Sequence, residues 1–299
     1  MNTTSPVKGF LYAIFAYFLW GILPLYWKLL IAVDSRHILA FRILFSLILV
    51  AIILLAQKNF KWLTVLRDKK KRALIILTAM LICINWGLYI WAVNSGHTLY
   101  TSLGYYITPL VTICMGLLFF RERLRPLQWA AVILALTGVL LLTILSGELP
   151  WVSLLLALTF SFYGLLKKKV PLSAMESLGA ETIVSIPVSF MLFSFNFDGP
   201  KPVFTGLQGL EYLAVLPFHT LAILSVCGLA TMLPLFLFAK AAKLLPLSAI
   251  GFCQFLAPTM TFILGTFVFG ETFSFHNLVS FLFIWTAVII YIISLRSKH

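Results

Sequence analysis

Long apolar stretches separated by short polar segments run through the whole chain. A helix that crosses ~30 Å of hydrocarbon needs about 20 mainly apolar residues. Ten stretches come close to that length, and we expect each to form a spanning helix. They cover residues 9–32, 37–56, 73–93, 98–119, 126–146, 150–167, 177–195, 217–239, 246–269 and 275–295. The pattern therefore predicts an all-α integral membrane protein with ten transmembrane helices.

Two stretches, YITPLVTICMGLLFFRE and FLAPTMTFILGTFVFGE, align at an offset of 149 residues. The aligned pairs are Tyr106 with Phe255, Pro109 with Pro258, Gly116 with Gly265, Phe120 with Phe269 and Glu122 with Glu271. The repeat unit therefore contains five helices. An odd number of helices makes the second copy enter from the other side of the membrane, as in the inverted repeats of transporters. We expect a first five-helix repeat at 1–146 and a second, inverted repeat at 147–299.

Basic residues collect on one side of the predicted membrane. Of the 22 lysines and arginines, 18 lie at the chain ends or after the second, fourth, sixth and eighth helices, including the run 167–169. The other side holds Arg36 and Lys201, and the two remaining residues, Lys28 and Arg42, lie within spans. Because cytoplasmic loops are enriched in lysine and arginine, this bias predicts that both termini are cytoplasmic.

Composition indicates that lipid covers most of the surface. The chain is 62% hydrophobic and 10% charged, whereas soluble domains carry about 25% charged residues. The net charge of +13 does not indicate nucleic-acid binding, because the basic residues lie in short clusters between apolar runs. The cysteines lie in apolar stretches without metal-ligand spacing, and no P-loop, HExxH motif or nucleophile elbow occurs. We expect no ATP, metal, cofactor or catalysis.

Polar side chains inside the spans are candidates for a substrate site, because hydrocarbon makes each of them costly. Arg42 lies about a turn and a half into the second helix, where it either reaches the headgroups or faces a cavity and pairs with an anionic or polar substrate. Lys28 lies nearer its interface, which favours the headgroups. Asn85 and Gln254 lie too deep for that, so each either bonds another helix or lines a cavity. Thr231 is a weaker candidate, since a threonine can bond its own helix.

Aromatic residues and prolines lie at the same levels of the spans. Aromatic rings offer stacking and cation–π surface to a substrate, although many such rings pack against helices or lipid. The aromatic candidates are Trp20, Trp86, Tyr89, Trp91, Tyr105, Tyr106 and Tyr163. Pro109 and Pro258 are related by the repeat, and each removes a helix hydrogen bond. We expect a kink or hinge at both, with simple tolerance of proline in packed helices as the alternative.

Three glutamates complete the set of candidate residues. Glu181 is the carboxylate within a predicted span. It either exchanges protons in a proton-coupled carrier or bonds nearby backbone and basic residues. Glu122 and Glu271 end the fourth and ninth helices, and we expect each to cap the helix that follows.

Four segments together form a distinctive pattern: NWGLYIWAVNSGHTLYTSLGYYITPL at 85–110, TMLPLFLFAKAAKLLPLSAIGFCQFLAPTM at 231–260, LWGILPLYWK at 19–28 and ETIVSIP at 181–187. This pattern resembles the RarD branch of the EamA-type drug/metabolite transporter superfamily over nearly the whole chain. The resemblance implies a ten-helix fold with a central cavity, in a multi-pass protein of the bacterial inner membrane that exports or exchanges small organic solutes. One segment departs from the expected pattern E-x-L-A-H-R, since residues 37–42 read HILAFR.

These observations favour a secondary-active permease that moves small organic metabolites or drugs by alternating access between its two halves. A transmembrane enzyme would show titratable groups clustered at one depth, but those in the predicted spans are few and dispersed. A receptor would usually add a soluble signalling domain, which we do not recognise here. We expect a small-molecule substrate and the lipid bilayer as partners, and a homodimer is one arrangement open to the chain.

Overall fold

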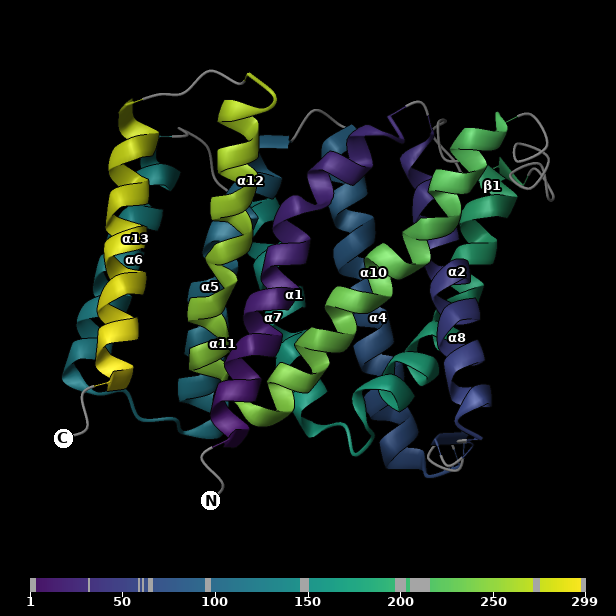
Figure 1. Ribbon diagram of the computed structural model, residues 1–299, viewed down its shortest axis with the longest axis horizontal. Helices are drawn as coiled ribbons and strands as arrows, with labels where there is room; N and C mark the ends of the chain where they lie inside the picture. The colour runs from purple at the N-terminus through teal and green to yellow at the C-terminus, as the bar shows by residue number, and fades with distance from the viewer. Residues whose placement is uncertain are drawn as a thin grey trace.

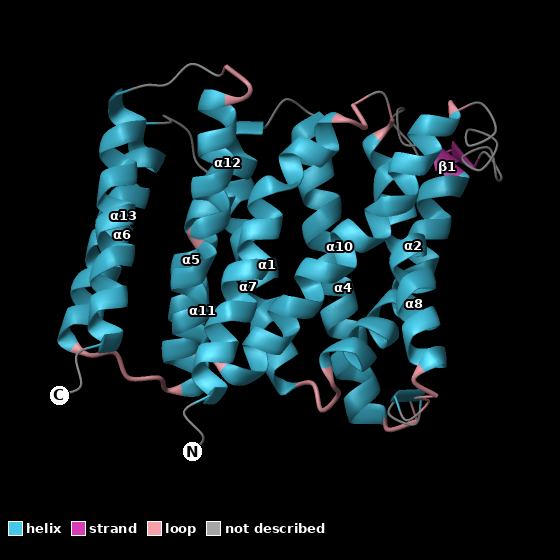
Figure 2. Ribbon diagram, in the orientation of Figure 1, coloured by secondary structure: helices cyan, strands magenta, loops and turns pink. Residues whose placement is uncertain are grey.

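The computed structural model consists of helices that run between two opposite faces of the molecule (Figures 1 and 2). It describes residues 4–31, 33–58, 60, 62–63, 67–94, 98–145, 151–196, 203–204, 216–270 and 275–296. The helices are α1 (Thr4–Lys28), α2 (Ser35–Ala56), α4 (Lys69–Asn94), α5 (Thr98–Phe120), α6 (Pro126–Leu145), α7 (Trp151–Lys169), α8 (Ala174–Ser194), α10 (Phe218–Leu244), α11 (Leu247–Gln254), α12 (Leu256–Phe267) and α13 (Phe275–Arg296). With α11 and α12 taken as one interrupted segment, the described residues form the ten predicted spans.

The ninth span, in which a kink or hinge is predicted at Pro258, is interrupted. A single helix is expected over 246–269, but α11 ends at Gln254 and α12 begins at Leu256. Pro258, four residues after Gln254, has no N–H to bond the Gln254 carbonyl. The interruption therefore coincides with the hydrogen bond that this proline removes, whereas α5 continues through Pro109.

A short antiparallel strand pair, β1 (Phe195–Asn196) and β2 (Val203–Phe204), lies between α8 and α10. Phe195 lies opposite Phe204 in this pair. The sequence predicts no strand here. The pair begins at the last residue of the seventh predicted span and otherwise falls in the longest predicted connection.

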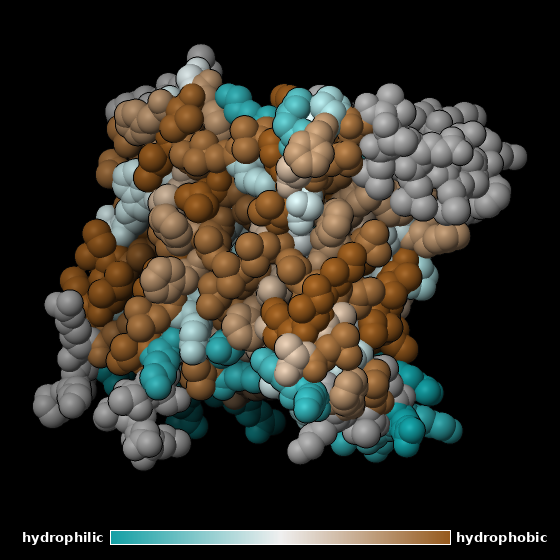
Figure 3. Space-filling model, turned by 45° about the vertical axis from the view of Figure 1, so that its right-hand side comes forward, coloured by the Kyte–Doolittle hydropathy of each residue, from teal (hydrophilic) through white to brown (hydrophobic). Residues whose placement is uncertain are grey.

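The outer surface of the helices is apolar. In the described residues, nine helices are long and apolar enough to cross a membrane when α11 and α12 are counted as one, and Gly104–Phe120 of α5 adds a shorter apolar stretch. Leu118, Ile144 and Phe267 each expose more than 70% of their surface. Hydrophobic residues form a broad band in Figure 3, and hydrophilic residues gather along its lower edge. Such a surface needs lipid rather than water as its solvent.

Packing between the helices is reciprocal. Helix α6 packs on α13, α2 on α8, and α5 on α11. Two further contacts each have a matching contact in the other half. The contact between α5 and α7 matches the contact between α12 and α1, and the contact between α4 and α7 matches the contact between α10 and α1. Exchanging the first five helices for the last five therefore maps these contacts onto one another, as two inverted repeats require. The domain boundary between 146 and 147 stays a prediction.

The first residues of α1 and the last residues of α13 lie at one face of the molecule, which we call the terminal face (Figure 1). Because ten spans alternate in direction, α1 and α7 cross in opposite senses. The connections after α2, α5, α7 and α10, which carry most of the basic residues, therefore lie at the terminal face. We call the opposite face distal. The cytoplasmic location of the termini stays a prediction that this distribution of charge supports.

The distal end of α2 is fixed by Asp34. Its carboxylate accepts a hydrogen bond from the backbone N–H of Arg36 at 2.8 Å and forms an ion pair with the Arg36 side chain at 2.7 Å. The hydrogen bond from this side chain is the main cause that holds the pKa of Asp34 below its usual value. The carboxylate therefore stays ionised as a cap and fixes the helix that carries Arg42.

Helices α5 and α11 approach closely at Gly251. A Cβ added there would lie 2.6 Å from Cγ1 of Ile113 and 2.8 Å from the carbonyl oxygen of Pro109. Glycine permits this approach, which is typical of helix contacts in membranes. The contact fixes the end of α11, and with it Gln254, beside α5.

Candidate substrate cavity

A cavity of about 180 Å³ lies among helices from both halves of the chain. Its lining is formed by Tyr17, Trp20, Leu23, Pro24, Trp27, Arg42, Asn85, Trp86, Tyr89, Tyr105, Thr108, Leu156, Phe160, Leu235, Gln254, Ala257, Pro258 and Thr261. At 1.5 Å rise per residue, Arg42 lies about 10 Å from the distal end of α2, and Tyr105 lies at a similar depth in α5. The cavity therefore occupies the region from mid-depth toward the distal face.

Arg42 faces this cavity rather than the headgroups. Its Nε donates a hydrogen bond of 2.9 Å to Oγ1 of Thr231 on α10. Its guanidinium carbon lies 4.9 Å from the ring centre of Trp27 and 4.6 Å from that of Trp86. These two cation–π contacts and the hydrogen bond hold the cation in place. Lys28, in contrast, is exposed at the last residue of α1.

No carboxylate neutralises Arg42 in the described part of the chain. The ionisable groups that act on it are Cys227, Tyr105, Tyr89 and Tyr26, which are neutral at pH 7. An unpaired cation within a span is costly. The site is therefore electropositive.

Asn85 both joins helices and lines the cavity. Its Nδ2 donates hydrogen bonds of 2.9 Å to the carbonyl oxygen of Leu156 and 2.9 Å to Oγ1 of Thr159. These bonds tie α4 to α7. The same side chain forms part of the cavity wall, so the two interpretations open from the sequence both apply.

Gln254 and Tyr17 contribute polar atoms without hydrogen bonds. Both residues are buried and line the cavity. The Tyr17 hydroxyl lies close to Gln254, yet neither this hydroxyl nor Oε1 of Gln254 has a hydrogen bond of normal geometry. A buried polar atom without a partner costs free energy. Both atoms are enclosed by protein, so the structure leaves this hydrogen-bonding capacity unused.

An aromatic cluster closes the cavity toward the terminal face. Trp20 lies 5.3 Å from Tyr17, 5.7 Å from Phe160 and 5.9 Å from Phe238, measured between ring centres. Tyr163 stacks on Phe238 at 5.9 Å. The cluster joins α1, α7 and α10, so helices from both halves form the floor. Tyr163, a predicted cavity residue, is fully buried in this floor and does not line the cavity.

The other candidates have varied positions. Tyr89 and Tyr105 form a ring pair at 5.9 Å on the cavity wall. Thr231 lines a smaller space of about 20 Å³ beside Arg42. Pro258 lines the main cavity, and its carbonyl accepts a hydrogen bond of 3.0 Å from the Tyr106 hydroxyl. Pro109 lies outside both linings and packs against α11. The side chain of Trp91 lies outside the described residues.

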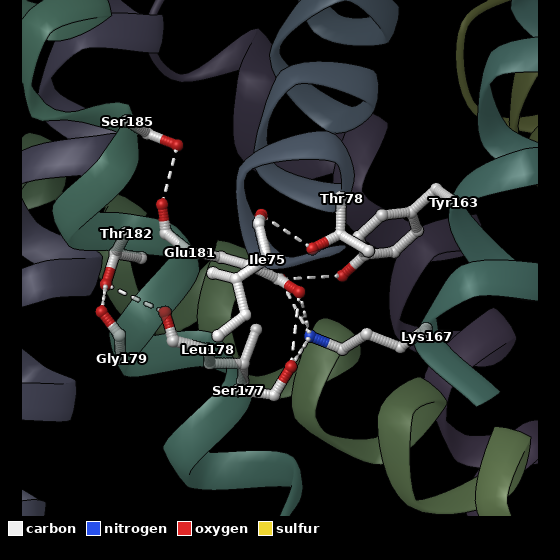
Figure 4. Close-up of polar contacts among 10 residues, drawn as sticks. All are labelled: Ile75, Thr78, Tyr163, Lys167, Ser177, Leu178, Gly179, Glu181, Thr182 and Ser185. Carbon is white, nitrogen blue, oxygen red and sulfur yellow. Dashed lines mark hydrogen bonds and ion pairs between the residues drawn. The ribbon is translucent and has the colours of Figure 1, made fainter. Parts of the chain in front are cut away.

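Glu181 forms a buried ion pair with Lys167 (Figure 4). Nζ of Lys167 lies 2.7 Å from both carboxylate oxygens and 2.8 Å from the Ser177 hydroxyl. The Tyr163 hydroxyl donates to the same carboxylate at 3.3 Å. Lys167 is 1% exposed, so its assignment to the basic connection after the sixth helix is wrong. Lys167 neutralises the carboxylate of Glu181. Glu181 also borders the small space beside Arg42.

Glu122 does not cap the helix that follows it. Its Oε1 accepts a hydrogen bond of 2.6 Å from the backbone N–H of Leu247, and its Oε2 accepts one of 2.9 Å from that of Ser248. It therefore caps α11 of the other half, whereas Gln128 bonds the backbone N–H of Arg125 at the start of α6. The prediction for Glu122 is thus corrected by a contact between the halves. Glu271 lies outside the described residues.

Several residues of the cavity wall, chiefly Trp27, Tyr17 and Phe160, are not among those predicted from the sequence. A signal for them exists on α1, where Tyr17, Trp20, Pro24 and Trp27 are spaced by three or four residues and share one helix face. Their common face explains why all four line the cavity.

The fold and the cavity together define a polytopic membrane protein with a solute-sized cavity between two reciprocal sets of helices, as in secondary transporters. The EamA-like transporter family matches residues 7–144. A Pseudomonas aeruginosa protein named as an uncharacterized transporter is 40% identical, over 97% of this chain and 95% of its own. The RarD protein of Streptomyces exfoliatus is 41% identical, over 94% and 87%.

A solved protein crystal structure superposes with a TM-score of 0.68 at 16% identity, covering 97% of this chain and 98% of that chain. This likeness supports the fold alone. The full-length relatives show more: the chain belongs to the EamA-like transporter family, in its RarD-type branch. It is a multi-pass transporter of the bacterial inner membrane.

Proposed function

We propose that this transporter is a secondary-active carrier that moves small organic solutes by alternating access. The observation that carries the proposal is the central cavity, which helices of both halves line and which an aromatic floor from α1, α7 and α10 closes toward the terminal face. Rocking of one half against the other would open this floor and close the distal side. If the termini are cytoplasmic, this floor separates the cavity from the cytoplasm.

The cavity volume favours small metabolites over drugs. Pockets that hold drug-sized ligands measure about 300–1,000 Å³, whereas this cavity measures about 180 Å³. Its wall is mainly aromatic and apolar, with a few polar groups. Such a wall suits an amphipathic solute of modest size.

The test is uptake into proteoliposomes that contain the purified protein. A panel of labelled amino acids, organic acids, nucleosides and amphiphilic drugs is screened with and without an imposed proton gradient. At least one solute should accumulate or exchange above protein-free liposomes, and Phe238→Trp, which overfills the floor, should slow that transport. A panel without any protein-dependent flux contradicts the proposal.

The same assay tests proton coupling by Glu181. Because Lys167 neutralises this carboxylate, the variant Glu181→Gln is combined with Lys167→Met to avoid an unpaired cation. If Glu181 carries the coupled proton, the double variant loses its response to the gradient while solute exchange continues. An unchanged response would assign Glu181 to structure alone.

A further inference from the structure

We propose that the cavity is built for a small organic monoanion, whose carboxylate pairs with the edge of the Arg42 guanidinium. The inference rests on the proposed function, because it names the class of solute that the carrier would take. It goes beyond a general solute cavity in assigning one charge and one orientation to the ligand.

Arg42 has hydrogen-bonding capacity left over. A guanidinium carries five N–H donors in a plane, and the structure uses Nε for Thr231. No other described residue bonds its Nη1 or Nη2 groups. The guanidinium carbon also lies over the rings of Trp27 and Trp86, neither of which takes up an N–H group by a hydrogen bond. The free edge therefore remains for a ligand, and two parallel N–H groups match the two oxygens of a carboxylate.

The charge of the ligand follows from the charge of its surroundings. The nearest ionisable neighbours of Arg42 are neutral at pH 7, and the cavity lining contains no aspartate or glutamate. Glu181, across the small adjoining space, is already paired with Lys167 at 2.7 Å. A buried cation is stabilised by an opposite charge. The described residues do not supply a negative charge that pairs with Arg42, so a bound anionic ligand would supply it.

The remainder of the wall limits the ligand to one charge. Aromatic and aliphatic side chains form most of it, and Arg42 is the charged residue among those that line the cavity. A second anionic group would lie against apolar rings without a partner, and a cationic group would repel Arg42.

The experiment measures binding to the purified protein in detergent. The probes are matched acids and amides of increasing size: benzoate and benzamide, phenylacetate and phenylacetamide, and indole-3-acetate and indole-3-acetamide. Binding is followed by the shift in Tm and by tryptophan fluorescence, since Trp27 and Trp86 flank the guanidinium. At least one acid should raise Tm and bind about 10- to 100-fold more tightly than its amide, as for hydrogen bonds to charged groups.

Variants then assign the preference to Arg42. Arg42→Gln should lose the preference for acids, and Arg42→Lys should keep part of it, because the charge remains but the planar fork is lost. Arg36→Gln, an arginine change on the same helix outside the cavity, should bind the acids as the wild type does. Should Arg42→Gln fail to fold, the acid–amide comparison in the wild type and in Arg42→Lys still decides.

Three results would overturn the inference: no acid binds at millimolar concentration, amides bind as tightly as acids, or a folded Arg42→Gln keeps the preference. Failure of the proposed function has a different signature. An acid that binds through Arg42 but is never carried across proteoliposomes would support the anion site and contradict carriage. A solute carried equally by wild type and Arg42→Gln, without preference for acids, would support carriage and contradict the anion site.

Discussion

Glu122 and Ser248 lie 126 positions apart in the sequence, yet the hydroxyl of Ser248 donates a hydrogen bond of 2.6 Å to Oε2 of Glu122. The backbone N–H of Ser248 donates to the same oxygen at 2.9 Å. Gly116 makes this contact possible, because a Cβ there would lie 2.7 Å from Oε2 and 3.0 Å from the nitrogen of Ser248. The contact joins the two halves at the terminal face, where the proposed alternating access would require them to separate.

Weakening this contact should favour opening at the terminal face. Glu122→Gln keeps the size of the side chain but loses its charge, and we expect the closed state to lose about 1–3 kcal/mol. The measurement is the rate at which a membrane-impermeant thiol reagent modifies Ala257→Cys from the terminal side, in a chain without its native cysteines. Glu176→Gln is the control, since Glu176 caps its own helix through Ser173. Equal rates in the two variants would show that Glu122 has no part in opening.

The ion pair of Lys167 and Glu181 should be strongly coupled. Lys167→Met leaves a buried carboxylate without its partner, and we expect a loss of about 3–5 kcal/mol in the free energy of unfolding. Glu181→Leu should cost a similar amount for the same reason. The double variant should be more stable than either single variant, because no charge is left unpaired. Thermal unfolding in detergent gives all three values, and simple additivity would contradict the coupling.

Phe238 should act as the centre of the cavity floor. It is 1% exposed, and its ring lies near those of Tyr17, Trp20, Phe160 and Tyr163. Phe238→Ala should cost about 3–5 kcal/mol in stability and open a path from the terminal side.

A matched control separates leakage from lost stability. Phe252 is similarly buried but stacks on Tyr291, away from the floor. Phe252→Ala should destabilise the protein by a comparable amount without exposing Ala257→Cys to reagent from the terminal side. If both variants increase that exposure alike, the floor does not depend on Phe238.

Asn85 should affect transport as well as packing. Asn85→Leu removes the amide from the cavity wall and its bonds to α7, and we expect insertion to persist while transport falls at least several-fold. Thr159→Val removes one of those bonds without changing the wall, at a cost of about 0.6–2 kcal/mol. Uptake and thermal unfolding are compared for both. An equal loss of transport in the two variants would reduce Asn85 to a link between helices.

The number of spans could be predicted from the sequence because apolar length is a local property. The strand pair and the interruption at Phe255 are less visible, although Pro258 marks the bond that is lost. The repeat was also readable, since its proline and glutamate recur at one offset. The partner of Glu122 could not be predicted from the sequence, because a cap between helices of different halves depends on tertiary packing.

The candidate site could be predicted only in part, because it also depends on tertiary packing. Depth in a span identifies Arg42, Asn85 and Gln254 as unusual, but depth alone does not tell which face a side chain presents. Tyr163 follows Phe160 by three residues, yet Phe160 lines the cavity and Tyr163 is fully buried. Lys167 looks like part of a basic loop until its partner on α8 is known.

The proposed alternating access requires that one cavity is reached from each side of the membrane in turn. The most direct measurement is modification of Ala257→Cys, a small change on the cavity wall, in right-side-out and in inverted vesicles. If the transporter works by alternating access, an impermeant thiol reagent modifies this cysteine from both sides, and a bound substrate slows both reactions. Modification from the distal side alone, under conditions in which solute is transported, would contradict it.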